Sequence, residues 1–287
     1  MNFPRILKKR KGYIDRIKPF MQKSVVKVLT GQRRVGKSFL LYQLIEEILG
    51  KEPDANIIYI NLEDFAFSSL QTAEDLHSYI ISHSKEKAKN YIFIDEIQDI
   101  PGFEKVIRSL LLNEDNDIYI TGSNAKMLSG ELATYLSGRY IEFKIYSLSY
   151  SEFLEFHGLT ESETSYELYS RYGGLPYLLN LPLEDETVNE YLKSVYSTIV
   201  FRDVVSRYKL RNTLFLEKLI QFLSENIGNL FSAKNISDYL KSQHTAISVN
   251  QIQSYTEYLN NAFLIHRVER YDLIGKRVFE IGEKYYF

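Results

Sequence analysis

A glycine-rich segment near the amino terminus has the residue types and the spacing to bind a chain of phosphates. It reads GQRRVGKS over residues 31–38, a complete match to the pattern G-x-x-x-x-G-K-[ST]. The glycines let the backbone wrap with its N–H groups inward, and a helix that begins near Lys37 adds the positive end of its dipole. Lys37 is then placed to reach the β- and γ-phosphates of a nucleotide, and the Ser38 hydroxyl to complete a Mg²⁺ shell. We therefore expect the nucleotide-binding residues to be Gly31, Gln32, Arg33, Arg34, Val35, Gly36, Lys37, Ser38 and Phe39.

Two adjacent acids follow the apolar run YIFI at residues 91–94. An acid at the carboxyl end of a strand beside a phosphate loop can hold Mg²⁺ through water, and we assign this role to Asp95. Glu96 is then placed to orient and deprotonate an attacking water molecule, so the pair predicts hydrolysis. The competing interpretation is a solvated turn or a helix cap, and the preceding phosphate loop favours the catalytic one.

Further polar groups follow the next two expected strands. The segment DIYITGSN at residues 117–124 ends in small polar residues. We expect Ser123 or Asn124, preferably Asn124, to touch the γ-phosphate or the attacking water, whereas the alternative is a simple turn. Arg139 precedes a later strand and could stabilise the phosphoryl group on a neighbouring subunit's nucleotide. An ordinary surface arginine explains that position equally well.

An alternation of strands and helices is needed to bring these residues together. Short β-branched runs predict strands, and stretches with helical spacing of apolar residues separate them. Five strands alternating with helices predict an α/β fold with a mainly parallel sheet covered on both faces. The expected strands are 24–30, 56–61, 91–94, 117–121 and 140–146, and the expected helices are 37–49, 72–83, 103–112 and 131–136.

The pattern changes after residue 148. Helical spacing covers residues 151–157, 162–172 and 184–208, interrupted by Gly173, Gly174, Pro176 and Pro182. Helices over 214–227, 233–241 and 249–262 precede strands over 264–271 and 277–281, which is the order of a winged helix. The sequence thus predicts an α/β core with a basic N-terminal arm over residues 1–148, a helical lid over 149–212 and a winged helix over 213–287.

The order of these motifs resembles prokaryotic ATPases of the AAA+ superfamily. The resemblance rests on GQRRVGKS, FIDEIQ, YITGSN, SGR and YGGLP, followed by the winged helix, and it covers nearly the whole chain. It implies a P-loop NTPase core of the AAA+ type that binds and hydrolyses ATP with Mg²⁺. The residues carried over are a Walker A loop at 31–38, Walker B acids Asp95 and Glu96, a sensor at Ser123 or Asn124, and an arginine finger at Arg139, which implies a homo-oligomer. The GGLP turn is similar to the lid motif of related signalling ATPases, in which the proline, here Pro176, packs on the adenine.

Two features depart from that group. Its members usually continue past the winged helix into a restriction-endonuclease-like domain, whereas this chain stops at Tyr285-Tyr286-Phe287 in an apolar run, so we expect a truncated form. The expected recognition helix, residues 249–262, contains no lysine or arginine. A winged helix that contacts protein is therefore as consistent with the sequence as one that binds DNA.

The distribution of charge suggests where a phosphate-rich partner could bind. Residues 1–37 carry twelve lysines and arginines and the single acid Asp15, although the whole chain has a net charge of −2. Lys8 to Lys11, together with wing residues Arg267, Arg270, Lys276 and Arg277, predict weak, non-specific DNA binding. A solvated arm is the alternative interpretation of the N-terminal charges.

Composition excludes several other classes of protein. The chain has no cysteine, so disulfides, thiolate metal sites and cysteine nucleophiles are excluded. No apolar run is long enough for a transmembrane helix, and we expect no membrane partner and a cytoplasmic location.

The leading interpretation is a Mg²⁺-dependent ATPase that moves its lid and winged helix. The alternatives are a P-loop small-molecule kinase and a nucleotide-gated binding module with little turnover.

Overall fold

The computed structural model describes residues 8–125, 131–136, 138–243, 245, 247–269 and 282–287. The chain divides into two compact units, residues 1–192 and residues 193–287. We describe each unit by itself. No helix among the described residues is both long enough and apolar enough to cross a membrane.

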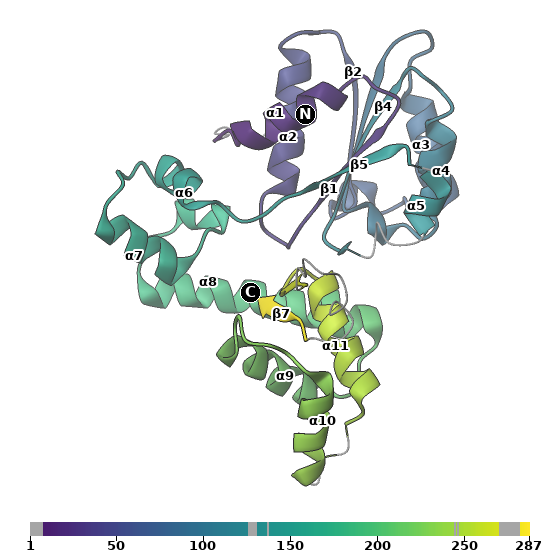
Figure 1. The fold of residues 1–287 in the computed structure, drawn as a ribbon. Helices are drawn as coiled ribbons and strands as arrows, with labels where there is room; N and C mark the ends of the chain where they lie inside the picture. Colours follow the sequence, from purple (N-terminus) through teal and green to yellow (C-terminus); the bar gives the residue numbers. More distant parts are fainter. Residues whose placement is uncertain (1–7, 126–130, 137, 244, 246, 270–281) are drawn as a thin grey trace, which may run out of the picture. The chain divides into compact units, whose positions relative to one another are not determined.

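A five-stranded, wholly parallel sheet forms the centre of the first unit, as the sequence predicts (Figure 1). Its strand order is β2-β3-β4-β1-β5, so β4 lies between β1 and β3. Because all five strands run in the same direction, their carboxyl ends lie at one edge. The strands are β1 (Val26–Thr30), β2 (Asn56–Asn61), β3 (Asn90–Asp95), β4 (Asn116–Gly122) and β5 (Tyr140–Lys144).

Helices cover both faces of this sheet (Figure 1). Side chains alternate along each strand, so in β3 Tyr91 and Phe93 pack on one face while Ile92 and Ile94 pack on the other. Burial on both faces explains why the strands are nearly continuous apolar runs. The first face carries α1 (Lys11–Ile17) and α2 (Lys37–Leu49), and the second carries α3 (Ala73–His83), α4 (Phe103–Leu110) and α5 (Glu131–Leu136).

Two short helices, α6 (Tyr150–His157) and α7 (Glu163–Tyr172), follow the sheet and are called the lid helices below. The segment after β5 is joined to the turn after α7, because the Leu148 N–H donates to the Gly174 carbonyl at 2.6 Å. A Cβ at Gly174 would lie 2.2 Å from the Leu148 oxygen, so this approach requires glycine. The boundary between the two compact units falls at residue 192, within α8 (Asp185–Thr198). The division into three domains stays a prediction.

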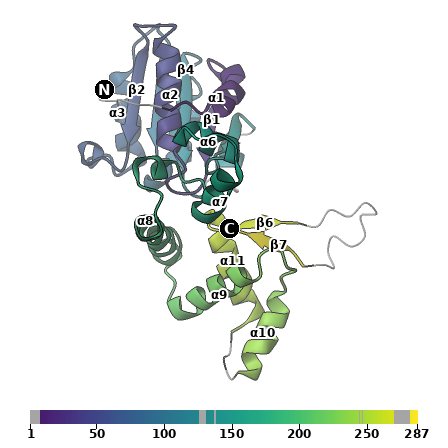
Figure 2. The same cartoon turned by 90° about the vertical axis from the view of Figure 1, so that its left-hand side faces the viewer.

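The second unit has the element order of a winged helix (Figure 2). A π-helical segment, Ile199–Ser206, precedes α9 (Thr213–Glu225), α10 (Ala233–Ser242) and α11 (Val249–Asn261). Strand β6 (His266–Val268) pairs antiparallel with β7 (Lys284–Tyr286), and Phe231 forms a bridge to Glu283. The first strand is shorter than predicted, and the second predicted strand, 277–281, lies outside the described residues. The last described residues supply β7.

An ion pair between two adjacent strands lies wholly inside the core. Lys27 of β1 contacts the Asp117 carboxylate of β4, and both side chains are 0% exposed. The carboxylate also accepts hydrogen bonds from the Tyr119 hydroxyl and the Gln22 backbone N–H, each at 2.8 Å. Lys27 donates in addition to the Val25 carbonyl at 2.9 Å. Removing one member of such a pair leaves a buried charge without compensation.

We expect Asp117→Asn to lower the free energy of unfolding by about 3 to 5 kcal/mol, the usual cost of breaking a buried ion pair. Urea denaturation followed by circular dichroism measures this change. Asp115→Asn removes the same charge from an exposed position two residues earlier and should leave the unfolding midpoint nearly unchanged. Equal stability of the two variants would contradict the role given to Lys27 and Asp117.

Candidate functional site

Three neighbouring strands deliver the predicted site residues to the same edge of the sheet. The phosphate loop, residues 31–38, follows β1, the acids Asp95 and Glu96 end β3, and Thr121 to Asn124 end β4. Since β4 lies next to β3, its terminal residues Thr121 and Ser123 contact the acids Asp95 and Glu96. The strand order therefore assembles the site.

Left-handed backbone conformations shape the phosphate loop. Gly36 has φ +94° and directly precedes α2, and Arg34 has φ +70°. Gly31 lies so close to the chain after β5 that a Cβ there would be 2.1 Å from the Ile145 oxygen. Glycine is therefore required at the two ends of the motif for different steric reasons. At Gly31 the reason is a close approach to another segment, and at Gly36 it is the left-handed conformation before the helix.

The Lys37 ammonium lies inside the loop and is only 4% exposed. It donates to the carbonyls of Gly31 and Gln32 at 3.0 and 3.1 Å. Its Nζ is 3.6 Å from Glu96 Oε1, which links the phosphate loop to the end of β3. This cation is therefore positioned between the loop and the acid, where the terminal phosphates of a nucleotide would lie.

Asp95 is buried among hydroxyl groups. It accepts hydrogen bonds from Ser38 and Thr121, and the Tyr59 hydroxyl lies 3.3 Å from its Oδ2. Burial raises the pKa of Asp95 above its usual range. The assignment of Ser38 and Asp95 as Mg²⁺ ligands stays a prediction. One carboxylate and one hydroxyl are hard oxygen ligands, and Mg²⁺ at such a site is completed by water and substrate phosphates.

Glu96 adopts a left-handed conformation, φ +57° and ψ +46°, that turns the chain sharply at the end of β3. Its carboxylate accepts from the Ser123 hydroxyl at 2.8 Å and from the Gln98 amide at 2.5 Å. Burial favours its neutral form, but the Lys37 charge and these hydrogen bonds outweigh burial and lower the pKa of Glu96. The Lys37 charge and the hydrogen bonds from Ser123 and Gln98 thus favour the charged form of this carboxylate.

Thr121 is a site residue that the sequence analysis did not single out. Its hydroxyl accepts from the Glu96 backbone N–H at 2.9 Å and donates to the Asp95 carboxylate. The strand register would have identified Thr121 as a site residue. Ile120 of β4 pairs with Ile94 of β3, so the next residue, Thr121, lies beside Asp95. Tyr59 and Gln98 were not singled out either, although they contact Asp95 and Glu96 respectively. Of the two sensor candidates, Ser123 contacts Glu96 directly, and Asn124 is buried in the same turn.

The remaining predicted residues differ in how close they lie to this centre. Pro176 is at the loop, with its Cγ 3.7 Å from the Cβ position of Gly36. Arg33 is buried and forms an ion pair with Glu63 at 2.8 Å. Val35 is buried, whereas Arg34 and Phe39 are exposed. These positions are compatible with the predicted cradle, in which the backbone rather than every side chain binds phosphate.

Arg139 is exposed at the amino ends of the strands, opposite the carboxyl ends that carry the site. It precedes β5, and its carbonyl accepts from the Val26 N–H at the start of β1 at 3.0 Å. The phosphate loop follows the other end of β1, about 16 Å away at the rise of a five-residue parallel strand. The structure therefore does not bring Arg139 to the site of its own chain.

The expected DNA-binding charges are largely engaged in contacts within the chain. Arg10 is 4% exposed, and Lys9 lies within 4 Å of Glu46 and Glu47. Arg10 is therefore not part of a free basic arm, in contrast to the expectation for Lys8 to Lys11. The wing residues Arg270, Lys276 and Arg277 lie outside the described residues.

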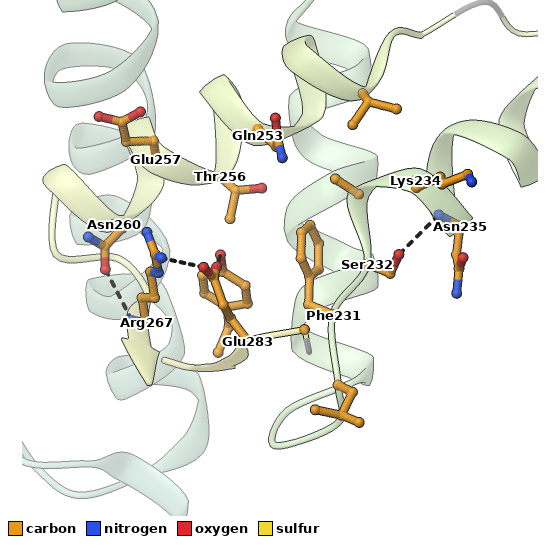
Figure 3. Close-up of a pocket in the computed structure, with 15 residues that line it drawn as sticks. Phe231, Ser232, Lys234, Asn235, Gln253, Thr256, Glu257, Asn260, Arg267 and Glu283 are labelled. Atoms are coloured by element: carbon orange, nitrogen blue, oxygen red, sulfur yellow. Dashed lines mark hydrogen bonds and ion pairs between the residues drawn. The ribbon is translucent and has the colours of Figure 1, made fainter. Parts of the chain in front are cut away.

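Arg267 lines a pocket of about 880 Å³ in the second unit, between α10, α11 and the two short strands (Figure 3). Its guanidinium pairs with Glu283 across the pocket wall and with Glu269 at 3.2 Å. The Asn260 side chain accepts from the Arg267 backbone N–H at 3.1 Å. The positive charge of Arg267 is thus already compensated by carboxylates, which weakens the DNA-binding interpretation.

Comparison with known proteins identifies relatives over nearly the whole chain. Residues 23–154 match a family model described as an AAA domain, and residues 163–287 match one described as a domain of unknown function. An uncharacterized protein of Haemophilus influenzae is 37% identical over 96% of this chain and 70% of its own length. An uncharacterized protein of Methanocaldococcus jannaschii is 32% identical, over 88% of this chain and 58% of that protein.

Solved structures with a related fold have low sequence identity. The Aeropyrum pernix ORC1 protein in complex with DNA is 13% identical with a TM-score of 0.44, over 98% of this chain and 90% of that one. The replication initiator DnaA bound to AMPPCP and single-stranded DNA is 15% identical with a TM-score of 0.38, over 79% and 73% of the two chains. The matched AAA domain and the 37% identical relative, taken with the strand order and the phosphate loop, show that the chain belongs to the AAA+ superfamily of P-loop ATPases.

Proposed function

We propose that the site binds ATP with Mg²⁺ and hydrolyses it to ADP and phosphate. The observation that carries this proposal is the position of the Glu96 carboxylate, which lies 3.6 Å from Lys37 and next to the Ser38–Asp95 pair. These are the positions needed for a base, a phosphate-binding cation and two metal ligands. Mg²⁺, bound through Ser38 and Asp95, would supply charge neutralisation on the phosphates.

The chain's own residues account for the remaining parts of the reaction. On nucleotide binding, Lys37 exchanges the carbonyls of Gly31 and Gln32 for phosphate oxygens, and this releases Glu96 Oε1. Glu96 then accepts a proton from water while the water oxygen attacks the γ-phosphorus and the bond to the β-phosphate oxygen breaks. Ser123 keeps the carboxylate oriented through its 2.8 Å hydrogen bond. Movement of the lid helices and of the second unit with nucleotide state is part of the same proposal.

A small-molecule kinase is the alternative that shares a phosphate loop. A kinase transfers the phosphoryl group to a bound hydroxyl and has little need of a second acid beside the metal ligand. The position of Glu96 supports transfer to water instead. Release of phosphate from ATP in the absence of any acceptor distinguishes the two reactions.

Lys37→Ala should remove most of the affinity for ATP, because it deletes the cation placed on the β- and γ-phosphates. Isothermal titration calorimetry measures the loss. Lys51→Ala removes an exposed lysine just beyond the end of the same helix and should bind ATP normally. Unchanged binding by Lys37→Ala would contradict the assignment of the phosphate loop.

Glu96→Gln should retain ATP binding and lose hydrolysis by about a hundredfold or more, the usual scale of a general base. Phosphate release under single-turnover conditions measures the chemical step. Glu114→Gln removes an exposed carboxylate from the turn before β4 and should leave the rate unchanged. Normal turnover by Glu96→Gln would place the base at another residue.

Arg139 can act only on the nucleotide of another copy, given its place at the far edge of the sheet. We therefore expect the turnover per subunit to rise with protein concentration. Arg139→Ala should abolish this rise and lower the plateau by about a thousandfold, the lower range for an arginine finger. Arg108→Ala, on the exposed side of α4, is the matched control. Turnover that is independent of concentration and of Arg139 would favour an ordinary surface arginine.

A further inference from the structure

A single buried arginine joins the phosphate loop to the first lid helix. The Arg10 guanidinium uses all five of its N–H donors: Nε and one NH2 hydrogen bind Glu152 at 2.8 Å, and the others bind three backbone carbonyls. These carbonyls belong to Val35 in the phosphate loop and to Tyr146 and Ser147 in the connection after β5, at 3.2, 2.8 and 3.3 Å. No other residue type has a planar fork with five donors, so lysine cannot reproduce this set.

The contact with Val35 fixes the orientation of one peptide group of the phosphate loop. The Val35 carbonyl and the Gly36 N–H belong to the same planar trans peptide and point in opposite directions. Holding the carbonyl toward Arg10 therefore turns the Gly36 N–H away from Arg10. That peptide joins Val35, which is buried, to Gly36, whose φ of +94° lies in the left-handed region that favours glycine. The N–H of a residue just before the helix is a natural phosphate donor.

The contact with Glu152 fixes the start of α6. Glu152 accepts from the Ser149 backbone N–H at 3.0 Å and donates its own N–H to Ser149 Oγ at 3.3 Å, which forms a capping box. Burial favours the neutral form of Glu152, but the hydrogen bonds from Arg10 and Ser149 and the Arg10 charge outweigh burial and lower the pKa of Glu152. At the other end of α6, the Lys8 ammonium binds the carbonyls of Glu155 and Phe156. Both ends of the helix are thus held by one short segment.

That segment is itself anchored on the helix of the phosphate loop. The Gln43 side chain in α2 accepts from the Arg10 backbone N–H and donates to the Lys8 carbonyl, each at 3.0 Å. The Arg10 guanidinium also stacks 4.5 Å from the centre of the Tyr13 ring. Residues 8–10 therefore form a rigid connection from α2 to α6, with Arg10 at its centre.

We infer that Arg10 is a positioning residue that holds the Val35–Gly36 peptide ready for phosphate and couples nucleotide binding to the placement of lid helix α6. The inference rests on the proposed function, since it requires that the loop bind ATP. A phosphate that engages the Gly36 N–H reinforces the orientation set by Arg10, and a guanidinium held firmly at Val35 holds Glu152 more firmly in turn. By linkage, disruption of the Glu152 contact must also weaken nucleotide binding.

Calorimetry on the full chain tests the first half of this inference. Arg10→Ala should weaken ATP binding by about tenfold, within the usual range of a coupling between sites. Glu152→Gln keeps one oxygen for the capping box but loses the charge and one of the two oxygens that accept from Arg10, and it should weaken ATP binding by about fivefold. Glu155→Gln, an exposed position on the same helix, should bind as the unmodified chain does. Glu152→Gln keeps the test valid even if Arg10→Ala fails to fold.

A second readout separates coupling from general loss of stability. A glutamate-specific protease can cut at Glu161 in the exposed loop between α6 and α7. Mg-ATP should slow this cleavage by about fivefold in the unmodified chain and in Glu155→Gln, but not in Arg10→Ala or Glu152→Gln. A merely structural role would raise cleavage equally with and without ATP.

The outcomes distinguish the two proposals. If Arg10→Ala and Glu152→Gln bind ATP as strongly as the unmodified chain does, the role of Arg10 is overturned and the proposed function is not. ATP protection of the lid that persists in both variants would overturn the coupling. Failure of the unmodified chain to bind ATP at all would overturn the proposed function and the inference together.

Discussion

The position of β4 between β1 and β3 is the constraint on which the rest of the site depends. It allows one hydroxyl, that of Thr121, to contact the backbone of Glu96 and the carboxylate of Asp95 at once. It also brings Ser123 to Oε2 of the Glu96 carboxylate, whose Oε1 faces Lys37. If β1 paired directly with β3, the hydroxyl groups of Thr121 and Ser123 would not lie beside the two acids to hold them in place. At the other edge, the Lys27–Asp117 pair connects the same strands, β1 and β4, inside the core.

Local pattern was sufficient to predict the sheet and the motif positions. Strands buried on both faces are nearly continuous apolar runs, and the phosphate loop has a spacing that few turns share. The bounds of α2 and β2 agree with the prediction to the residue. Predicting that Thr121 lies at the site requires the register between β3 and β4, which are 20 residues or more apart in sequence. A single sequence does not contain that register.

Charge was the property least predictable from sequence. The N-terminal residues are strongly basic when counted, yet Lys9, Arg10, Lys27 and Arg33 are paired with acids that lie 30 or more residues away. A count of charges assumes that every lysine and arginine meets solvent, whereas burial with a distant carboxylate removes a charge from the surface field. Arg267 is exposed but is also paired, with Glu283 just before β7. Pairings between distant segments, and not the total, decide which charges are available to a partner.

The left-handed conformation of Glu96 has a consequence for how this protein can evolve or be engineered. A residue with a Cβ at φ +57° is held there against its own preference, at a cost on the order of 1 to 3 kcal/mol. Glycine would relax that strain, and asparagine would reduce it, but both would remove the carboxylate. Selection for thermal stability alone would therefore favour replacement of the residue that we assign as the base. The sharp turn after β3 is in this sense a stability–activity trade-off confined to one position of the chain.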